Sequence, residues 1–555
     1  MKTKTSKIVL TLSVLIIPIL LFSAYKIAAP KSDFDVAKNL ELYHSAVKNI
    51  RMYYVDDVDA AGLINESIQE FLNKLDPYTV FYSESRIEEF EFMNTGSYAG
   101  IGVNLTERDN KLYVTGLYAD SPADRSGVKA GDYIVSVDDH QITKENIDFV
   151  RNLLQGSVGS EVEIEVERNY PRNGELSRMS FKLKRERIKS HAVDHHTIDD
   201  DGIIYIKFGI FTQNSSKEFL EALQKYSDKD ITGLVIDLRN NPGGFLQEAV
   251  NILDLFIAKD KTLVSTKGRL SQWNSVFKAK KTPLFPDLPV AVLVNKSSAS
   301  ASEIVAGVFQ DYDRAIIIGE KTYGKGLVQI TKDLGYNTKI KITTAKYYLP
   351  GGRCVQALDY SHLRDDGSVS EVPDSLKSAF KTENGRIFYD GGGVVPDRLV
   401  KNISDQSFIR FLTNEFIIHD YATKFAAEHD TTHVSRDYSF ESFADFETFV
   451  NQKKLIHRNE LQKELDQLAA DNIAEDLELD DEIKQLADKA QQNIPDLIRK
   501  NKKDVSTVVE QEILARFYGE NGRVIFSLDK DPLLKEAKML LLDGEKYKSL
   551  LNLYE

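Results

Sequence analysis

The sequence predicts a multidomain α+β protein, because the spacing of its apolar residues changes several times along a long chain. The chain has 555 residues, which at about 100–200 residues per domain is enough for three or four domains. Helical spacing comes first, strand-like alternation follows, and strands then alternate with helices before a charged helical region. We expect an export signal or membrane anchor at 1–30, a helical N-terminal domain at 31–97, a strand module at 98–187, an α/β core at 188–402 and a helical C-terminal domain at 403–555.

The composition excludes several classes of protein. The chain has 71 Lys and Arg against 85 Asp and Glu, a formal charge of −14, which argues against nucleic acid as a partner because no broad basic face is available. A hydrophobic share of 42% with 10% aromatic residues excludes general disorder and a polytopic membrane protein. The single cysteine, Cys354, excludes an intrachain disulfide and a thiolate zinc cluster. We expect no metal and no cofactor.

Basic residues and a short apolar run begin the chain. Lys2, Lys4 and Lys7 precede an apolar run from Ile8 to Phe22, a pattern typical of an export signal. The run has about 15 residues, fewer than the ~20 of a membrane-spanning helix, and no clear cleavage site follows it. We therefore expect export to the periplasm or another extracytoplasmic space. The segment is either cleaved or kept as an anchor in the inner (cytoplasmic) membrane.

A helical pattern follows, and then a module of strands. Apolar residues recur at three- and four-residue spacing from 35 to about 95, as in Leu40, Tyr43 and Val47, with a break at Leu75-Asp76-Pro77-Tyr78. From 97 to 187 the spacing changes to that of short strands with one helix near 145–154. The clearest strands of this module are 112–114, 133–137 and 162–166.

Strands and helices alternate from residue 202 onward, which indicates an α/β core. The expected strands are 203–208, 233–238, 289–294 and 315–318, and the expected helices are 215–226, 246–256 and 302–312. Beyond residue 400 the sequence becomes rich in Lys, Glu, Asp, Gln and Leu, with a long helical stretch at 455–487. Such helices suit self-association or contact with an adaptor protein, and packing against the core is the equal alternative.

A glycine motif opens the strand module. Gly100-Ile101-Gly102-Val103 places two glycines one residue apart, which lets the backbone take positive φ and turn successive N–H groups toward one point. Together with Asp120-Ser121-Pro122-Ala123 and Gly127-Val128-Lys129-Ala130-Gly131-Asp132, the motif resembles a PDZ domain. The resemblance implies a groove between the strand after Gly102 and the 145–154 helix. Such a groove binds the C-terminal tail of a protein or peptide, and apolar C-termini suit it.

Three segments of the core carry residues suited to chemistry. The Gly-Gly turn of 237–244 can aim N–H groups at an oxyanion. The serine-rich segment 295–304 lies at the start of an expected helix, whose free N–H groups stabilise negative charge. Spacing does not choose among its four serines at 297, 298, 300 and 302. The third segment has Lys325 between glycines, but it has no P-loop pattern.

In this order, and after Leu75-Asp76-Pro77, the segments resemble the C-terminal processing (tail-specific) serine peptidases, from about residue 35 to 400. This family joins a PDZ domain to an α/β core of the Clp-protease and crotonase type. The resemblance implies Ser300 as nucleophile, Lys325 as base and Gln329 as the residue that orients Lys325. It also implies a supporting acid at Glu303, oxyanion donors at the N–H of Ala301 and of Gly243 or Gly244, and a gating residue at Arg168.

The chemistry requires a neutral lysine. A lysine has a reference pKa of ~10.4, and lowering it to ~7–8 costs about 4 kcal/mol, which burial can supply. Neutral Lys325 would take the Ser300 proton, and the alkoxide would form an acyl-enzyme. Two alternatives are a non-catalytic scaffold with an incidental Ser–Lys pair and a crotonase-like enzyme acting on an acyl thioester. The second is disfavoured because a PDZ domain has no evident task there.

Overall fold

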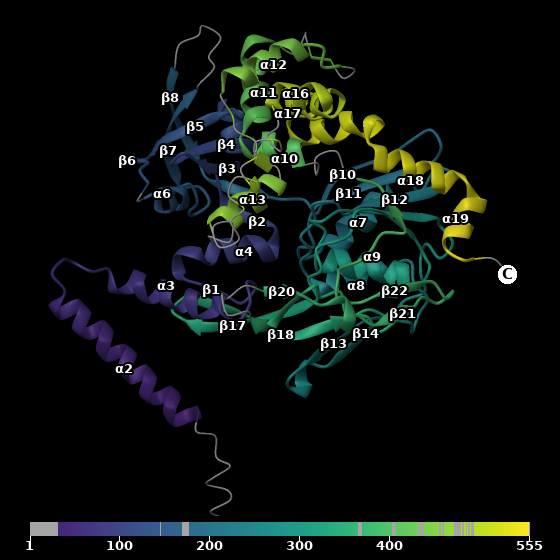
Figure 1. The fold of residues 1–555 in the computed structure, drawn as a ribbon, viewed down its shortest axis with the longest axis horizontal. Helices are drawn as coiled ribbons and strands as arrows, with labels where there is room; N and C mark the ends of the chain where they lie inside the picture. Colours follow the sequence, from purple (N-terminus) through teal and green to yellow (C-terminus); the bar gives the residue numbers. More distant parts are fainter. Residues whose placement is uncertain are drawn as a thin grey trace, which may run out of the picture. The chain divides into compact units, whose positions relative to one another are not determined.

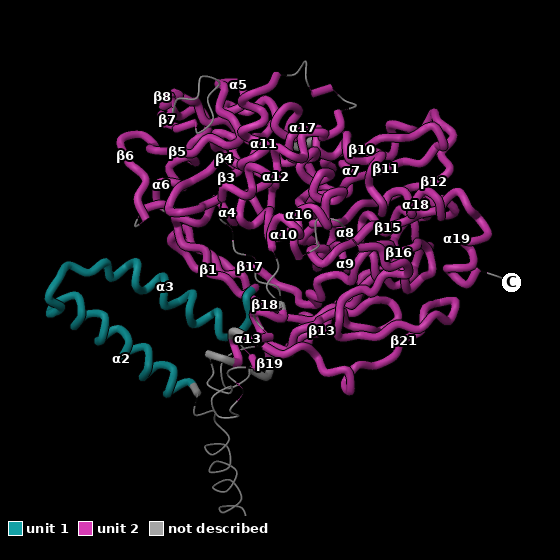
Figure 2. Tube along the Cα trace, turned by 45° about the horizontal axis from the view of Figure 1, so that its top comes forward, with its two compact units in different colours: residues 1–77 teal, residues 78–555 magenta. Residues whose placement is uncertain are grey.

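The chain divides into two compact units, residues 1–77 and 78–555 (Figure 2). In this computed structural model the described residues are 32–553 except 145, 169–176, 364–368, 402–406, 431–433, 436–437, 454, 456, 458–459, 471–478, 480–481, 484, 487–488 and 490–492. The expected export segment at 1–30 lies outside them. Within the described part, no helix has the length and apolarity needed to cross a membrane.

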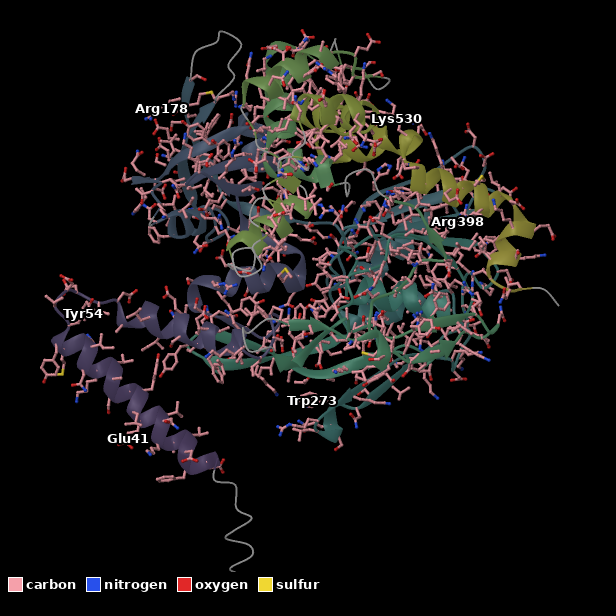
Figure 3. The ribbon with its side chains drawn as sticks, in the orientation of Figure 1. Glu41, Tyr54, Arg178, Trp273, Arg398 and Lys530 are labelled. Carbon is pink, nitrogen blue, oxygen red and sulfur yellow. The ribbon has the colours of Figure 1, made fainter. Side chains whose placement is uncertain are left out.

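The first unit contains two helices, α2 (Ser32–Tyr53) and α3 (Ala60–Asn73). Asp59 caps α3, because its carboxylate accepts the N–H groups of the first turn. The side chains of Glu41 on α2 and of Tyr54 just after it extend into solvent (Figure 3). A hydrogen bond between Tyr43 and Ser67 joins the two helices.

The strand module of the second unit is an antiparallel sheet in the order β3-β4-β5-β7-β8. Its strands are β3 (Val103–Arg108), β4 (Lys111–Leu117), β5 (Asp132–Val137), β7 (Glu161–Arg168) and β8 (Ser177–Lys184), with β6 (His140–Gln141) beside β5. In β7 the apolar side chains at 162, 164 and 166 are buried and alternate with glutamates, as a one-sided sheet requires. Helices α5 (Pro122–Ser126) and α6 (Ile147–Leu153) complete the module, and β2 (Ser97–Gly100) pairs with β9 (Glu186–Lys189).

The core is a mostly parallel sheet in the order β10-β11-β12-β15-β16-β23. Its strands β10, β11 and β12 lie side by side in Figure 1. The strands are β10 (Val193–Ile198), β11 (Ile203–Phe208), β12 (Gly233–Asp237), β15 (Val290–Val294), β16 (Ile316–Gly319) and β23 (Arg398–Leu399). The central strands are continuous apolar runs because both faces of the sheet are buried. Helices α7 (Ser215–Gln224), α8 (Leu246–Leu253) and α9 (Ala301–Asp311) cover one face.

The second face is covered by helices from the far end of the chain, α18 (Pro532–Leu542) and α19 (Gly544–Leu550). Residues of α18 such as Leu533 and Leu540 share one buried cluster with Tyr205 and Leu293 of the sheet. Helices α18 and α19 therefore pack against the core, which is one of the two alternatives expected for the C-terminal helices.

A second sheet lies beside the core in the order β1-β18-β13-β14, with β17 paired to β18. Its strands are β1 (Val80–Tyr82), β13 (Thr262–Gly268), β14 (Ser275–Lys278), β17 (Leu327–Gly335) and β18 (Thr338–Tyr348). The expected helical N-terminal domain thus also contains a strand, followed by α4 (Ile87–Thr95). The local spacing did not indicate β1, because its pairing partner is more than 250 residues away at 339–341.

The other C-terminal helices form a core of their own. They are α10 (Ser407–Asn414), α11 (Ile417–Glu428), α12 (Phe443–Gln452), α16 (Ile494–Lys500) and α17 (Lys502–Ser527). The expected long helix at 455–487 is represented by α13 (Glu460–Ala470). An ion pair of 3.2 Å between Arg108 and Asp420 joins this helical region to the strand module.

We expect Leu540→Ala to lower the free energy of unfolding by about 2–5 kcal/mol, because it empties space between α18 and the sheet. Leu542 in the same helix is 54% exposed, and Leu542→Ala should cost less than about 0.5 kcal/mol. Urea unfolding followed by circular dichroism measures both. Equal losses for the two variants would contradict the packing of α18 on the core.

Candidate active site

Ser300 lies on a sharp turn between β15 and α9. Its backbone has φ 56° and ψ −112°, a region that residues other than glycine rarely adopt and that is often kept at functional sites. The residue is half-buried and directly precedes Ala301, the first residue of α9. The turn therefore holds the Ser300 side chain at a helix N-terminus, where the peptide N–H groups favour negative charge.

The other three serines of this segment have different surroundings. The Ser298 hydroxyl is buried and donates to the Leu238 carbonyl at 2.8 Å. The Ser302 hydroxyl is also buried and donates to the Asn241 carbonyl at 3.0 Å. Ser297 is exposed on the connecting loop. Two of the four serines thus join the segment to the loop after β12, which favours Ser300 as the reactive one.

The Gly-Gly turn lies against the Ser300 turn. A Cβ on Gly243, which has φ 95°, would come within 2.8 Å of the Ser300 Cβ and of the Ala301 nitrogen. Only glycine fits this close approach. The Gly243 N–H donates to the Asn241 side chain at 2.9 Å, so one of the expected oxyanion donors is engaged within its own loop. Asn241 joins this loop to the end of β11, because its Nδ2 also donates to the Phe208 carbonyl at 2.7 Å. The local sequence does not indicate this role, since Phe208 is more than 30 residues away.

Glu303 joins the serine segment to the lysine segment. Its buried carboxylate accepts the Ser300 N–H at 2.9 Å and the Lys325 N–H at 2.8 Å on Oε2. On Oε1 it accepts the Gly324 N–H at 2.7 Å and the Thr322 hydroxyl at 2.6 Å. Burial raises the pKa of the Glu303 carboxyl, although these hydrogen bonds act in the opposite direction. One carboxylate thus fixes the backbones of both expected dyad residues.

The loop that carries Lys325 has further supports. The Gly326 N–H donates to the Gln356 side chain at 2.7 Å, and the Tyr323 N–H donates to the Ser298 carbonyl at 3.0 Å. The Lys325 Nζ lies 4.3 Å from the centre of the Tyr78 ring. The sequence predicts only a helix break at Tyr78, and no local signal indicates that this residue lies beside Lys325.

Gln329, the residue expected to orient Lys325, lies in β17. Its Nε2 donates to the Thr343 hydroxyl of β18 at 3.2 Å. Thr343 in turn donates its backbone N–H to the Thr79 hydroxyl at 3.3 Å. Gln329 is therefore connected to the residue that follows Tyr78.

A cavity of about 340 Å³ lies between β3 and α6. Its lining residues are Glu89, Phe92, Tyr98, Ile101, Val103, Asn104, Leu105, Tyr118, Arg151, Leu154 and Gln155. Ile101 and Val103 of the expected peptide-binding motif are among them. Gly102 has φ 82°, whereas Gly100 lies in β2 without positive φ, so only the second glycine has the expected conformation. The cavity occupies the place that the PDZ resemblance gives to a bound peptide.

Arg168 ends β7 and is held inside the strand module. Its guanidinium donates to both carboxylate oxygens of the buried Asp132, at 2.6 and 2.8 Å, and to the Gly127 carbonyl at 3.1 Å. This bidentate pair is a strong and geometrically specific contact. It fixes Arg168 at the loop that leads into β5.

The loop that carries Gly243 is anchored at its start by charges. Burial alone would raise the pKa of Asp237, but Arg239 and Lys207 outweigh it and lower the pKa well below its usual range. Arg239 also pairs with Asp531 before α18, at 2.6 Å. The C-terminal helix thus contacts the charge network at the base of the Gly-Gly turn.

Two histidines, His195 and His196, lie next to each other in β10. His196 Nδ1 is hydrogen-bonded to the Tyr226 hydroxyl at 2.8 Å. Across the described part of the chain, no group of His, Cys, Asp and Glu is placed to hold a metal ion.

Three family models match this chain. They are Peptidase family S41 at 202–360, PDZ domain at 99–183, and Probable PDZ-protease, C-terminal helical domain, at 408–541. The carboxy-terminal-processing protease of Bartonella bacilliformis is 33% identical over 325 residues, covering 58% of this chain and 73% of that protein. The carboxy-terminal processing protease CtpB of Bacillus subtilis is 30% identical over 334 residues, covering 59% of this chain and 68% of that protein.

Among the solved structures that match this chain is a photosystem II D1 C-terminal processing protease, with 25% identity and a TM-score of 0.37 over 65% of this chain and 92% of that one. The sequence matches confirm the family resemblance and the fold class stated from the motifs. The chain therefore belongs to the carboxy-terminal processing proteases of peptidase family S41, serine-type peptidases, and joins a PDZ domain and a C-terminal helical domain to the peptidase core.

Proposed function

We propose that this peptidase cleaves exported proteins with a Ser300–Lys325 dyad and selects them by their C-terminal tails. The observation that carries the proposal is the Glu303 carboxylate, which accepts the backbone N–H groups of both Ser300 and Lys325. These residues are 25 positions apart in the sequence, and one buried group brings their backbones together.

The reaction begins when neutral Lys325 removes the proton from the Ser300 hydroxyl. The oxygen attacks the carbonyl carbon of the scissile peptide bond, and the resulting oxyanion lies near the N-terminus of α9. The Ala301 N–H and a Gly-Gly N–H stabilise that charge. Because the Gly243 N–H is bonded to Asn241, we assign the second donor to Gly244. The Lys325 ammonium then protonates the leaving amine, and water hydrolyses the acyl-enzyme.

The cavity beside β3 supports recognition of an apolar C-terminus. Its walls include Phe92, Ile101, Leu105 and Leu154, which suit an apolar side chain. An extended tail can pair with the edge of β3 while its carboxylate meets the loop at Gly102. Export, supported by the basic and apolar residues of 1–30, places these substrates in an extracytoplasmic space. An N-terminal anchor and an adaptor contact through the helical region stay predictions.

We expect Ser300→Ala and Lys325→Ala each to lower kcat/KM for a tailed peptide at least about 10³-fold. Lys325→Arg should be equally inactive, because a guanidinium does not lose its proton. A fluorophosphonate probe should label the wild type and leave Ser300→Ala unlabelled. The control is Ser297→Ala, which should keep both activity and labelling. Wild-type hydrolysis by Ser300→Ala would exclude the dyad.

Glu303→Gln should lower both stability and activity. A glutamine amide presents an NH₂ group to two of the donors that Glu303 now accepts, and each unsatisfied buried donor costs about 1–3 kcal/mol. We expect a fall of about 2–5 kcal/mol in the free energy of unfolding and a loss of activity in the folded fraction. The matched control is Glu218→Gln, whose carboxylate binds the Ala192 N–H and Lys189 instead. The prediction is wrong if both variants are equally active.

Arg168 should make cleavage depend on the tail. We expect the wild type to cleave a substrate with an apolar free C-terminus faster than the same substrate with an amidated C-terminus, and Arg168→Ala to lose this difference. Arg178→Ala is the control, because Arg178 lies exposed on the neighbouring β8 (Figure 3). Initial rates of cleavage measure both variants. If Arg168→Ala keeps the wild-type ratio between the cleavage rates of the free and amidated substrates, gating through this residue is excluded.

A further inference from the structure

The Lys325 side chain needs a support that its backbone contacts do not provide. Glu303 and Gln356 fix the peptide groups at Lys325 and Gly326, but five side-chain bonds separate the Lys325 Cα from the reacting nitrogen. The ring of Tyr78 lies 4.3 Å from that nitrogen, within the range of a cation–π contact. The Tyr78 face therefore forms one wall of the site in which Lys325 must act.

Tyr78 is itself held from several directions. Its hydroxyl donates to the Tyr323 hydroxyl at 3.4 Å. The Tyr360 ring packs edge-on against the Tyr78 ring, with 6.0 Å between the two ring centres. The next residue, Thr79, is bonded to Thr343 of β18, and β1 then pairs with the same strand. The Gln329 side chain donates to that Thr343 as well. The ring is thus fixed to the strand on which the loop of Lys325 also rests.

A cation–π contact stabilises the ammonium and not the neutral amine. Burial, followed by the hydrogen bonds of Tyr323 and Tyr360, raises the pKa of the Tyr78 phenol, so the ring remains uncharged and presents a π face. Titratable groups around the lysine loop include the Glu303 carboxylate at its backbone and the Tyr347 phenol that donates to the Ser300 carbonyl. They also include the Cys354 thiol beside Gly326 and Lys346, which lies opposite Leu327 in β18.

We propose that Tyr78 is a positioning residue of the dyad, whose ring face holds the Lys325 ammonium beside Ser300 between catalytic steps and sets the pH at which Lys325 becomes a base. The proposal rests on the proposed Ser300–Lys325 chemistry. It gives Tyr78, the last residue of the predicted helix break, a task in catalysis. The ring guides the nitrogen while it is charged and releases it when the proton leaves.

The test is the dependence of kcat/KM on pH, measured from about pH 5 to pH 10 with a fluorogenic tailed peptide. Tyr78→Leu removes the π face, and we expect the acid limb to move down by about 0.5–1 pH unit, because the ammonium loses its stabilisation. We also expect its plateau kcat to fall several-fold, since the amine is less well placed. Tyr78→Phe keeps the face and should keep the acid limb of the wild type. Tyr389→Leu, which changes an exposed tyrosine on β22 (Ile387–Tyr389), is the control.

A second comparison keeps the ring shape constant, in case Tyr78→Leu does not fold. Phenylalanine and 3,4,5-trifluorophenylalanine at position 78 have similar shapes, but fluorine makes the ring face less negative. We therefore expect the acid limb of the kcat/KM profile to lie at a lower pH in the fluorinated variant. If the acid limb lies at the same pH in the phenylalanine and trifluorophenylalanine variants, the proposal is wrong, independently of the result for Tyr78→Leu. Wild-type hydrolysis by Lys325→Ala would instead refute the dyad itself, so the two failures are distinguishable.

Discussion

The candidate active site depends on one buried carboxylate. Glu303 has no exposed surface, and it accepts three peptide N–H groups and one hydroxyl. Hydrogen bonds to a charged acceptor are stronger than neutral ones, and burial strengthens them further. The Ser300 turn has an unfavourable backbone conformation, and a contact of this strength can hold it. Without Glu303, the Ser300 and Lys325 peptide groups would lose the one acceptor that both of them bind.

The rest of the core brings the segments to this carboxylate. Parallel strands β12 and β15 end at the same edge of the sheet, so the Gly-Gly turn and the Ser300 turn follow them side by side. Helices on both faces make that edge rigid, since the strands are buried on each side. Asp531, just before α18, also pairs with Arg239 at the base of the Gly-Gly turn. The C-terminal helices thus support the edge of the sheet that carries the candidate active site.

The parts of the fold that could be predicted from the sequence are those that depend on neighbouring residues. The apolar runs predict the core strands, and the glycine and serine motifs predict the turns, from neighbouring residues alone. The glycine pair at 243 and 244 likewise indicates that another backbone segment approaches closely. Sequence reasoning could not choose among the four serines, because the choice lies in the hydrogen bonds of Ser298 and Ser302 to a distant loop. It also missed β1 and Tyr78, whose places depend on pairing with a strand more than 250 residues away.

A lysine base must be held in place by groups that do not keep it charged. A carboxylate 4 Å from the nitrogen would favour the ammonium by about 4 kcal/mol at an effective dielectric constant of 20, or about three pH units. A cation–π contact is worth about 0.5–2 kcal/mol, at most about one and a half units. The protein applies the strong interaction to the backbone, where Glu303 binds the Lys325 N–H, and the weak one to the nitrogen, where Tyr78 lies. In the proposed mechanism, this division would fix the Lys325 backbone and still let the side chain lose its proton.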